Sequence, residues 1–209
     1  MPEATCFTPR VKSILLINGH QPFPTSPGRL NRAFCDRAKA HFEARGAAVR
    51  EVRTAEPWDT DLEVENQLWA DLILMQFPLN SMGLPWSLKR YLDEVYTAGM
   101  DGRLARGDGR SRKDPTRQYG SGGKLQGKRY MLSVTMNAPR TAFDDPGQDL
   151  FAGRSLDELL APVHINFAFF ALTRLPTFAA HDVSKAPQID ADLDRFDAHL
   201  NAHAAALRT

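Results

Sequence analysis

Short apolar runs of strand length alternate with segments of helical periodicity along most of the chain, and this alternation constrains the fold more than any other feature. The strand-like segments are residues 11–18, 48–53, 71–77, 130–135 and 175–183. The first of them contains the continuous apolar run 14–17, which is typical of a strand covered on both faces. Strands that alternate with helices indicate βαβ crossovers and therefore a parallel sheet.

The helical segments are predicted at residues 29–45, 62–69, 85–96, 155–172 and 189–207, with a break at Pro162 and with Pro85 at a first helical position. In the first of these, apolar residues recur every four positions: Leu30, Phe34, Ala38 and Phe42. Such a stripe indicates one buried helix face. We therefore expect an α/β fold, a flavodoxin-like doubly wound five-stranded parallel sheet with helices on both faces. Residues 1–10 are expected to form a flexible tail, and residues 11–209 the domain.

Charge and cysteine content narrow the class of protein. The chain has 26 Lys and Arg against 25 Asp and Glu, a net charge of +1. This balance argues against a nucleic-acid coat, a membrane-surface protein and a small acidic electron carrier. The two cysteines, Cys6 and Cys35, form no CxxC motif, which favours a reducing compartment. Residues 1–11 do not resemble a signal peptide, and no apolar run of about 18 residues occurs, so we expect a cytoplasmic protein without membrane insertion.

Ligands of doubly wound sheets bind at the carboxyl ends of the strands, which draws attention to three loops. The first loop, residues 19–29, holds Ser26, Gly28 and Arg29 before a helix start, where free N–H groups favour phosphate. It matches neither GxGxxG nor the P-loop pattern. The alternative is that Ser26 only caps the helix.

The second loop, residues 77–86 (FPLNSMGLPW), could run along the edge of a flat ring, and Gly83 would allow close approach. The alternative is a plain connection. In the third loop, residues 135–141 (TMNAPRT), Asn137 could face a carbonyl-rich ring edge, or it could simply begin a turn that Pro139 ends.

The remaining polar features are less specific. The segment 103–129 carries nine Lys or Arg residues, which could meet cofactor phosphates or form a solvated face. It has only one aromatic residue, so the sequence gives little support for nucleic-acid binding. No metal-binding spacing and no GxSxG elbow occurs, so we expect no metal site. His164 is interpreted as a satisfied buried histidine, and His181 as a weak candidate for a site.

The loops together resemble a known family. The segments that carry the resemblance are LLINGH, SPGRLN, NQLWADLILMQFP, MGLPWSLKRYLDEVYTAG, DGRSRKDPTRQYGSGGKLQGKRYMLSVTMNAP and LPTFAAHDV. They are similar to modulator of drug activity B, a family of bacterial NAD(P)H–quinone reductases in the flavodoxin-like superfamily, distantly related to DT-diaphorase. The resemblance implies FAD as cofactor, NADPH or NADH as hydride donor, a quinone or similar aromatic acceptor, and a homodimer with its active site at the subunit interface.

The resemblance also implies a set of cofactor-binding residues: Ser26, Gly28, Arg29, Leu30, Asn31 and Ala33 in the first loop and helix start, Pro78, Leu79, Asn80, Ser81 and Met82 in the second loop, Tyr119, and Thr135, Met136, Asn137 and Ala138 in the third loop. The implied mechanism is a two-electron relay of hydride from nicotinamide to flavin N5 and on to quinone. The backbone N–H of Met82 is the expected neighbour of N5. Tyr119 is expected to donate a hydrogen bond or close the pocket, and backbone N–H groups around Met136 and Asn137 to stabilise developing negative charge.

One departure from the family concerns aromatic residues. Asn80, Ser81 and Met136 stand where the family commonly has tryptophan, which leaves substrate preference open. Three rival functions remain: an FMN-dependent azoreductase or nitroreductase on the same fold, a flavodoxin-like electron carrier without a nicotinamide site, and a flavin-free scaffold or regulator.

Overall fold

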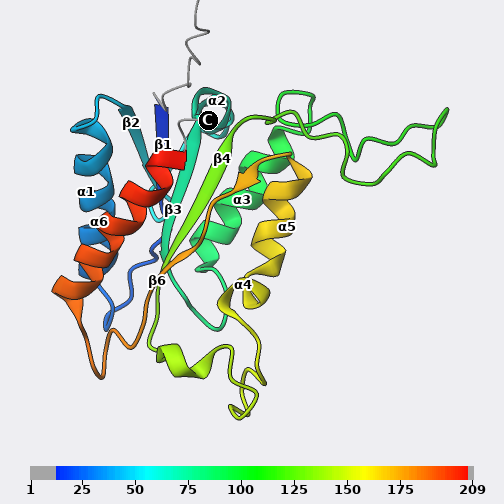
Figure 1. Ribbon diagram of the computed structural model, residues 1–209. Helices are drawn as coiled ribbons and strands as arrows, with labels where there is room; N and C mark the ends of the chain where they lie inside the picture. Colours follow the sequence, from blue (N-terminus) through cyan, green and yellow to red (C-terminus); the bar gives the residue numbers. More distant parts are fainter. Residues whose placement is uncertain (1–12, 207–209) are drawn as a thin grey trace, which may run out of the picture.

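The computed structural model describes residues 13–206 and shows one parallel sheet between two layers of helices (Figure 1). The strands follow the order β2-β1-β3-β4-β5, and β6 also pairs with β4. Their bounds are β1 Ser13–Asn18, β2 Ala48–Arg53, β3 Leu72–Pro78, β4 Arg129–Thr135, β5 Thr173–Arg174 and β6 Phe178–Ala180. Every pairing is parallel, so all carboxyl ends meet at one edge of the sheet.

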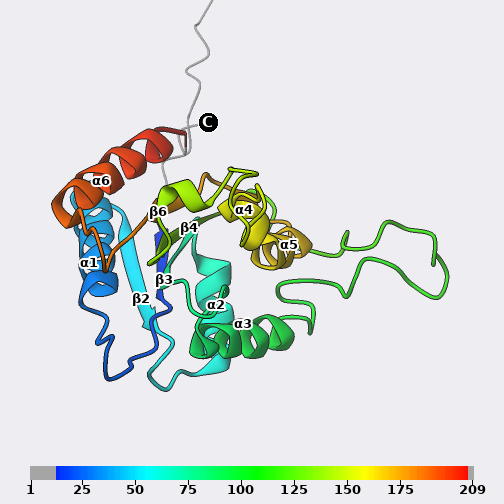
Figure 2. The ribbon, with the colours of Figure 1, turned by 90° about the horizontal axis from the view of Figure 1, so that it is seen from below.

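Helices cover both faces of this sheet, and their bounds are α1 Arg29–Glu43, α2 Thr60–Trp69, α3 Trp86–Ala98, α4 Leu156–Leu159, α5 Ala161–Phe169 and α6 Ile189–Ala206, with a 3-10 turn at Arg140–Ala142. Figure 2 shows α1 and α6 on one face, and α2, α3 and α5 on the other. This arrangement is the doubly wound fold that the alternation of segments predicts, and the fold prediction is confirmed.

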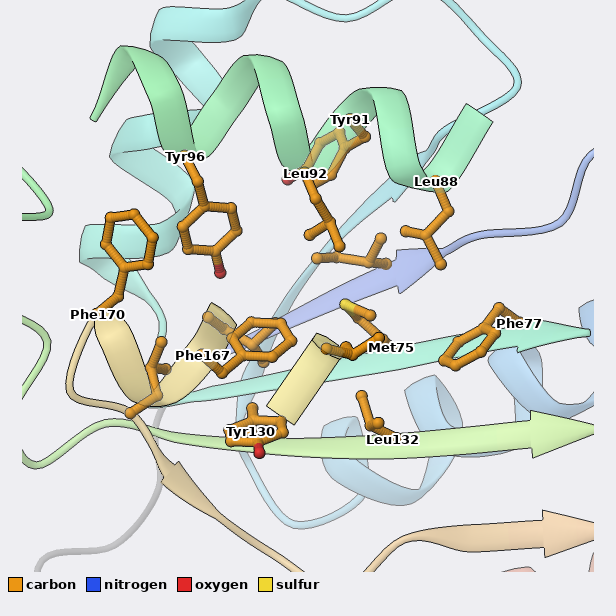
Figure 3. Close-up of a cluster of buried hydrophobic side chains, with 14 of the residues drawn as sticks. Met75, Phe77, Leu88, Tyr91, Leu92, Tyr96, Tyr130, Leu132, Phe167 and Phe170 are labelled. Atoms are coloured by element: carbon orange, nitrogen blue, oxygen red, sulfur yellow. The ribbon is translucent and has the colours of Figure 1, made fainter. Parts of the chain in front are cut away.

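Each face of the sheet has its own hydrophobic core, because side chains alternate along a strand. On the α1 and α6 face, Phe34 packs edge-on against Phe196 at a centroid distance of 5.1 Å. On the opposite face, Tyr130 stacks on Phe167 at 4.3 Å, within the cluster drawn in Figure 3. Central strands β1 and β3 are buried on both faces, as their continuous apolar runs predict.

The fifth strand differs from its predicted form. Residues 175–183 were expected to contain one strand, but the structure pairs β4 with two short pieces, β5 and β6. The Leu175 N–H still donates to the Tyr130 carbonyl oxygen, at 2.8 Å. Pro176 follows and has no N–H to donate, so the ladder stops there and resumes at Phe178.

Residues 101–128 form a long arm between α3 and β4 that projects from the body at the amino-terminal edge of the sheet (Figure 1). The buried side chains of Leu104 and Leu125 anchor its base. Short bridges join Asp101 to Arg106 and Ala105 to Gly123. This segment, which is rich in glycine and shows little periodicity, therefore extends away from the body and returns to it without forming a helix or a long strand.

Other boundaries agree to within a few residues. Pro85 precedes the first residue of α3 instead of occupying it, and the helix break expected at Pro162 lies at Leu160, with Pro162 in the first turn of α5. The expected tail 1–10, with Cys6, and the end of the last helix at Leu207 lie outside the described residues.

Candidate functional site

A cavity of about 610 Å³ lies at the carboxyl edge of the sheet, beyond the ends of β1, β3 and β4. All three loops singled out in the sequence contribute to its wall, and the segment between β6 and α6 closes it with Val183, Ser184 and Ile189. Of the predicted cofactor-binding residues, the structure brings together Ser26, Gly28, Arg29, Leu30, Asn31, Pro78, Leu79, Asn80, Thr135, Met136 and Asn137.

The wall formed by the first loop presents the start of α1. Gly28 precedes this helix in a left-handed conformation, with φ of 83°, and the first turn contains no acidic residue and no side-chain cap. The first helical N–H groups have no partner within the helix, and they carry the positive end of its dipole. The alternative that Ser26 only caps the helix does not hold, because Gly28 occupies the cap position. The helix start is therefore suited to an anion.

Gly28 is also required for a second reason. A Cβ at this position would lie 2.4 Å from Nδ1 of His20. The His20 ring lies against the turn, and its Nε2 is 3.1 Å from the Ser26 carbonyl oxygen. Burial lowers the pKa of His20 below that of an exposed histidine. His20 lines the cavity but was missed by sequence reasoning, although its place two residues after the end of β1 was a usable signal.

A smaller hollow of about 240 Å³ adjoins the cavity across His20, Pro27, Gly28 and Arg29. Its far wall comes from the end of β2 and the residues that follow, including Arg53 and Glu56. The two hollows therefore lie on either side of the same short segment at the helix start.

The second loop makes a tight turn at residues 80–83. Asn80 and Gly83 exchange two backbone hydrogen bonds, of 3.0 and 2.9 Å. The residues between them, Ser81 and Met82, have φ of 47° and 62°. Residues other than glycine rarely adopt this left-handed backbone conformation. The Leu79 N–H is fixed by the Thr135 carbonyl oxygen at 2.8 Å, so the second and third loops hold one another.

Ser81 and Met82 themselves do not line the cavity. Met82 is half exposed and lines a separate apolar hollow of about 460 Å³ with Leu84, Leu92 and Leu160. The structure therefore places the turn beside the cavity without adding these two residues to its lining.

The third loop contributes Thr135, Met136 and Asn137. The Met136 N–H donates to the Ala180 carbonyl oxygen at 2.9 Å, so it is not free to stabilise a ligand as predicted. Its side chain is buried and apolar. The Asn137 amide oxygen accepts a hydrogen bond from Ser184 Oγ at 2.6 Å, which ties the third loop to the segment before α6.

Three further predicted residues lie outside this lining. Ala33 lies further along α1. The Ala138 carbonyl oxygen faces His181 Nδ1 at 3.3 Å. Tyr119 is on the arm, 67% exposed, with its ring centroid 5.7 Å from that of Phe169. Since the arm leaves the opposite edge of the sheet, Tyr119 does not reach the cavity of its own chain (Figure 1).

The basic segment 103–129 does not line the cavity either, so the prediction that it meets cofactor phosphates finds no support within one chain. Several of its cations have structural partners instead. Arg103 pairs with Asp61 at 2.8 Å, and Arg110 with Asp108 at 2.6 Å. Lys128 donates to the last carbonyl groups of α2, at Leu68 and Ala70.

The two singled-out histidines also have structural surroundings. His164 Nδ1 is 2.8 Å from the Tyr130 hydroxyl, and its Nε2 is 3.2 Å from Asp157. Both ring nitrogens of His164 therefore have partners, as interpreted from the sequence, and its side chain is largely but not fully buried, at 11% exposed. His181 lines a different hollow, with Arg140 and Arg195, and is not part of the cavity.

The donor set of the cavity fits a flavin nucleotide. The open helix start and the glycine close to it suit phosphate groups, and Pro78, Leu79 and Met136 offer apolar contacts to a flat ring. Within residues 13–206, no three His, Cys, Asp or Glu side chains are grouped as a metal site would require. No helix in that same range is long and apolar enough to cross a membrane.

Comparison with known proteins gives one family match and several similar chains. Residues 12–204 match the family model Flavodoxin_2, flavodoxin-like fold. The chain is 43% identical over 188 residues to NADPH:quinone oxidoreductase MdaB of Haemophilus influenzae, covering 90% of this chain and 97% of that one.

Two crystal structures share the fold. One is a candidate quinone reductase from Klebsiella pneumoniae, with a TM-score of 0.73 at 22% identity, covering 92% of this chain and 85% of that one. The other is general stress protein 14 from Treponema denticola in complex with FMN, with a TM-score of 0.61 at 21% identity, covering 94% and 99%.

Proposed function

Because the chain belongs to the Flavodoxin_2 family, and within it to the family of modulator of drug activity B, we propose that it is an FAD-dependent NAD(P)H:quinone oxidoreductase. The observation that carries this proposal is the cavity in which the three loops meet at the carboxyl edge of the sheet. The loops come from distant parts of the sequence, and each contributes the kind of group that the proposed cofactor needs. The donor is NADPH or NADH, and the acceptor is a quinone or similar aromatic compound.

When bound, a flavin supplies the two-electron chemistry between nicotinamide and quinone. The residues of this chain bind and orient it. Ser26 and the first turn of α1 hold the phosphates, and the Arg29 side chain adds positive charge. The backbone of Pro78–Asn80 follows the ring edge, with Leu79 and Met136 excluding water from it. The Asn137 N–H remains as a donor toward the ring, since the Met136 N–H is occupied.

Two features support FAD over FMN. The first is that the cavity and the smaller hollow share His20, Pro27, Gly28 and Arg29 in their walls, which gives an elongated cofactor room on both sides of the helix start. The second is that Arg32 lines the smaller hollow and brings a positive charge to the place where the second half of an adenine dinucleotide would lie. An FMN-dependent reductase on the same fold remains the second candidate, because a structural neighbour was crystallised with FMN.

We also propose a homodimer in the cytoplasm, with the active site at the subunit interface. Large apolar side chains are exposed on the turn before α3, on α3, on α5 and on the arm: Met82, Trp86, Ile165 and Tyr119, respectively. Tyr119 is remote from the cavity of its own chain, so its proposed contact with the cofactor is made across the interface. Sedimentation at micromolar concentration tests the dimer, and a monomer at all concentrations would contradict it.

Anaerobic stopped-flow absorbance near 450 nm tests the activity. The FAD-loaded protein is mixed first with NADPH and then with a benzoquinone. We expect rapid bleaching and then rapid recovery, without a semiquinone band. Failure to bleach with either nicotinamide would overturn the proposal. Acid extraction and chromatography of the flavin from purified protein would separate FAD from FMN.

A matched pair of glycine variants tests the location of the site. Gly28→Ala and Gly46→Ala both place a methyl group on a backbone with positive φ, 83° and 78°. The new Cβ would meet His20 at position 28 but nothing within 4 Å at position 46. Both variants should lose about 1 kcal/mol of stability or more. Only Gly28→Ala should lose flavin affinity, and equal affinity in both variants would place the site elsewhere.

A further inference from the structure

A row of buried polar side chains crosses the α1 face of the sheet directly beneath the cavity. Asn18, Gln76 and Ser133 are cross-strand neighbours on β1, β3 and β4, and Asn31 of α1 lies over them. We call these four residues the polar row. All four are more than nine-tenths buried. Three hydrogen bonds join them: Ser133 Oγ to Gln76 Oε1 at 2.5 Å, Gln76 Nε2 to Asn31 Oδ1 at 3.0 Å, and Asn31 Nδ2 to Asn18 Oδ1 at 2.6 Å.

The direction of this chain of hydrogen bonds is fixed at one end by the backbone. The His20 N–H can only donate, and it donates to Asn18 Oδ1 at 3.3 Å. Asn18 therefore presents its oxygen to Asn31, so Asn31 must use its NH₂ group there and turn its own oxygen to Gln76. Gln76 in turn accepts from the Ser133 hydroxyl. Each amide has one orientation that satisfies its neighbours.

Stability alone does not explain this choice of residues. The flanking positions on β3 and β4 are apolar and buried, and apolar side chains at 76 and 133 would continue the core. A buried hydrogen bond contributes only about 1 kcal/mol net, whereas a satisfied polar network permits few alternative arrangements. The polar row thus fixes a geometry, and the element it fixes is the first turn of α1.

That first turn is held by Leu30, which packs against the core, and by the polar row. Gly28 provides no side-chain cap, and residues 29–32 include no acidic side chain to interact with the helix dipole. Asn31 is the third residue of α1, and its side chain links the turn to strands β1 and β3. Of these elements, α1 and β3 line the cavity directly, and β1 leads to His20, which lines it from the loop that follows the strand.

We propose that the polar row is a positioning device, which sets the anion-binding start of α1 at a fixed distance from the strand ends that carry the ring-edge loops. This inference rests on the proposed flavin site and assigns a task to Gln76 and Ser133, neither of which lines the cavity. Loss of the row lets the first turn shift, which weakens contacts to phosphate more than contacts to the ring.

The test compares two buried glutamines. Gln76→Leu removes both hydrogen bonds of Gln76 within the row. Gln67→Leu also removes two buried hydrogen bonds, to the hydroxyls of Tyr91 and Tyr96, but on the opposite face and away from the cavity. Affinities for FAD and for riboflavin, which lacks phosphate, are measured by fluorescence titration of the apoprotein. Ser133→Ala is the milder variant, to be used if Gln76→Leu does not fold.

Both glutamine variants should unfold at lower urea concentration. Only Gln76→Leu should lose FAD affinity, by about tenfold, the equivalent of one hydrogen bond, while its riboflavin affinity changes little. An unchanged ratio of FAD to riboflavin affinity in Gln76→Leu would overturn the inference.

Hydrogen exchange of the α1 amides at residues 32–35 gives a readout that needs no flavin. Exchange should accelerate in Gln76→Leu and not in Gln67→Leu. If the wild-type protein binds no flavin, the proposed function fails, and this exchange measurement alone decides whether the row holds the helix start. Equal exchange in both variants would show that it does not.

Discussion

The left-handed turn at residues 80–83 stores strain that a single substitution can release. Ser81 is exposed and has φ of 47°. A residue with a side chain loses about 1–2 kcal/mol in this conformation. Glycine avoids this strain, but it also gives the unfolded chain more conformational entropy, which lowers the free energy of unfolding by about 0.5–1 kcal/mol. Ser81→Gly should therefore stabilise the protein by about 0.5 kcal/mol, a rise in Tm of about 1–2 °C for a chain of this size.

Ser81→Val provides the opposite perturbation, because a β-branched residue is least compatible with positive φ. It should destabilise the protein by about 1–2 kcal/mol. Urea unfolding followed by circular dichroism, together with Tm, measures both variants. The control is Ser121→Gly, also exposed in a loop but without positive φ, which should lose stability through the unfolded state alone.

The reasoning would be refuted if Ser81→Gly were no more stable than Ser121→Gly. Quinone reduction by the flavin-loaded variants adds a second comparison. Glycine preserves the backbone of the turn and should preserve activity, whereas valine shifts the turn and should reduce it. Because the turn is joined to the ring-edge loop at Asn80, its geometry is the quantity that both measurements report.

Three further outcomes are expected. Burial raises the pKa of Glu63, which accepts hydrogen bonds from Tyr91 and Asn66, so its contribution to stability is complete below its unfolded pKa near 4.5 and is lost as the pH rises. The urea midpoint of Glu63→Gln should therefore increase relative to that of the wild type between pH 4 and 7. A difference between the two midpoints that does not change with pH would contradict this. Burial also raises the pKa of the Cys35 thiol, so this cysteine should not react with a thiol reagent until the protein unfolds. Reaction at the rate of a free thiol would show that α1 opens readily. Tyr130→Phe keeps the ring stacked on Phe167 but removes the hydroxyl that is hydrogen-bonded to His164 Nδ1. It should lower the free energy of unfolding in urea by about 1 kcal/mol, and no loss would mean that the hydroxyl makes no net contribution to stability.

The sequence was sufficient for the fold because local patterns and the layered architecture agree. The stripe on α1 predicts that Leu30, Phe34, Ala38 and Phe42 are buried; the last three are in the core, whereas Leu30 is only partly buried against it. On α3 the residues Leu88, Tyr91, Leu92, Val95 and Tyr96 recur at helical spacing in the same way, and all five are buried. Such periodic patterns report which face of an element is covered, and this information is local.

The site was only partly predictable, because some of its properties depend on contacts between distant segments. Ser184 and Ile189 line the cavity only because the chain returns beside β4. The Met136 N–H is taken by Ala180, 44 positions later in the chain, which no local pattern reveals. Tyr119 matched the family in sequence, but only the course of the arm shows that it cannot serve its own cavity.

The position of α6 bears on how the chain folds during synthesis. This last helix supplies Phe196 and Leu200 to the core around Phe34, on the face that α1 covers only in part. Chains emerge from the ribosome amino terminus first. The α1 face of the sheet therefore stays open to water until residues 189–206 have left the exit tunnel, while the α2 and α3 face can close earlier. During that interval, Phe34 and Phe178 lack the Phe196 ring that covers them both in the finished fold, and this face is where a nascent-chain chaperone would find exposed apolar surface.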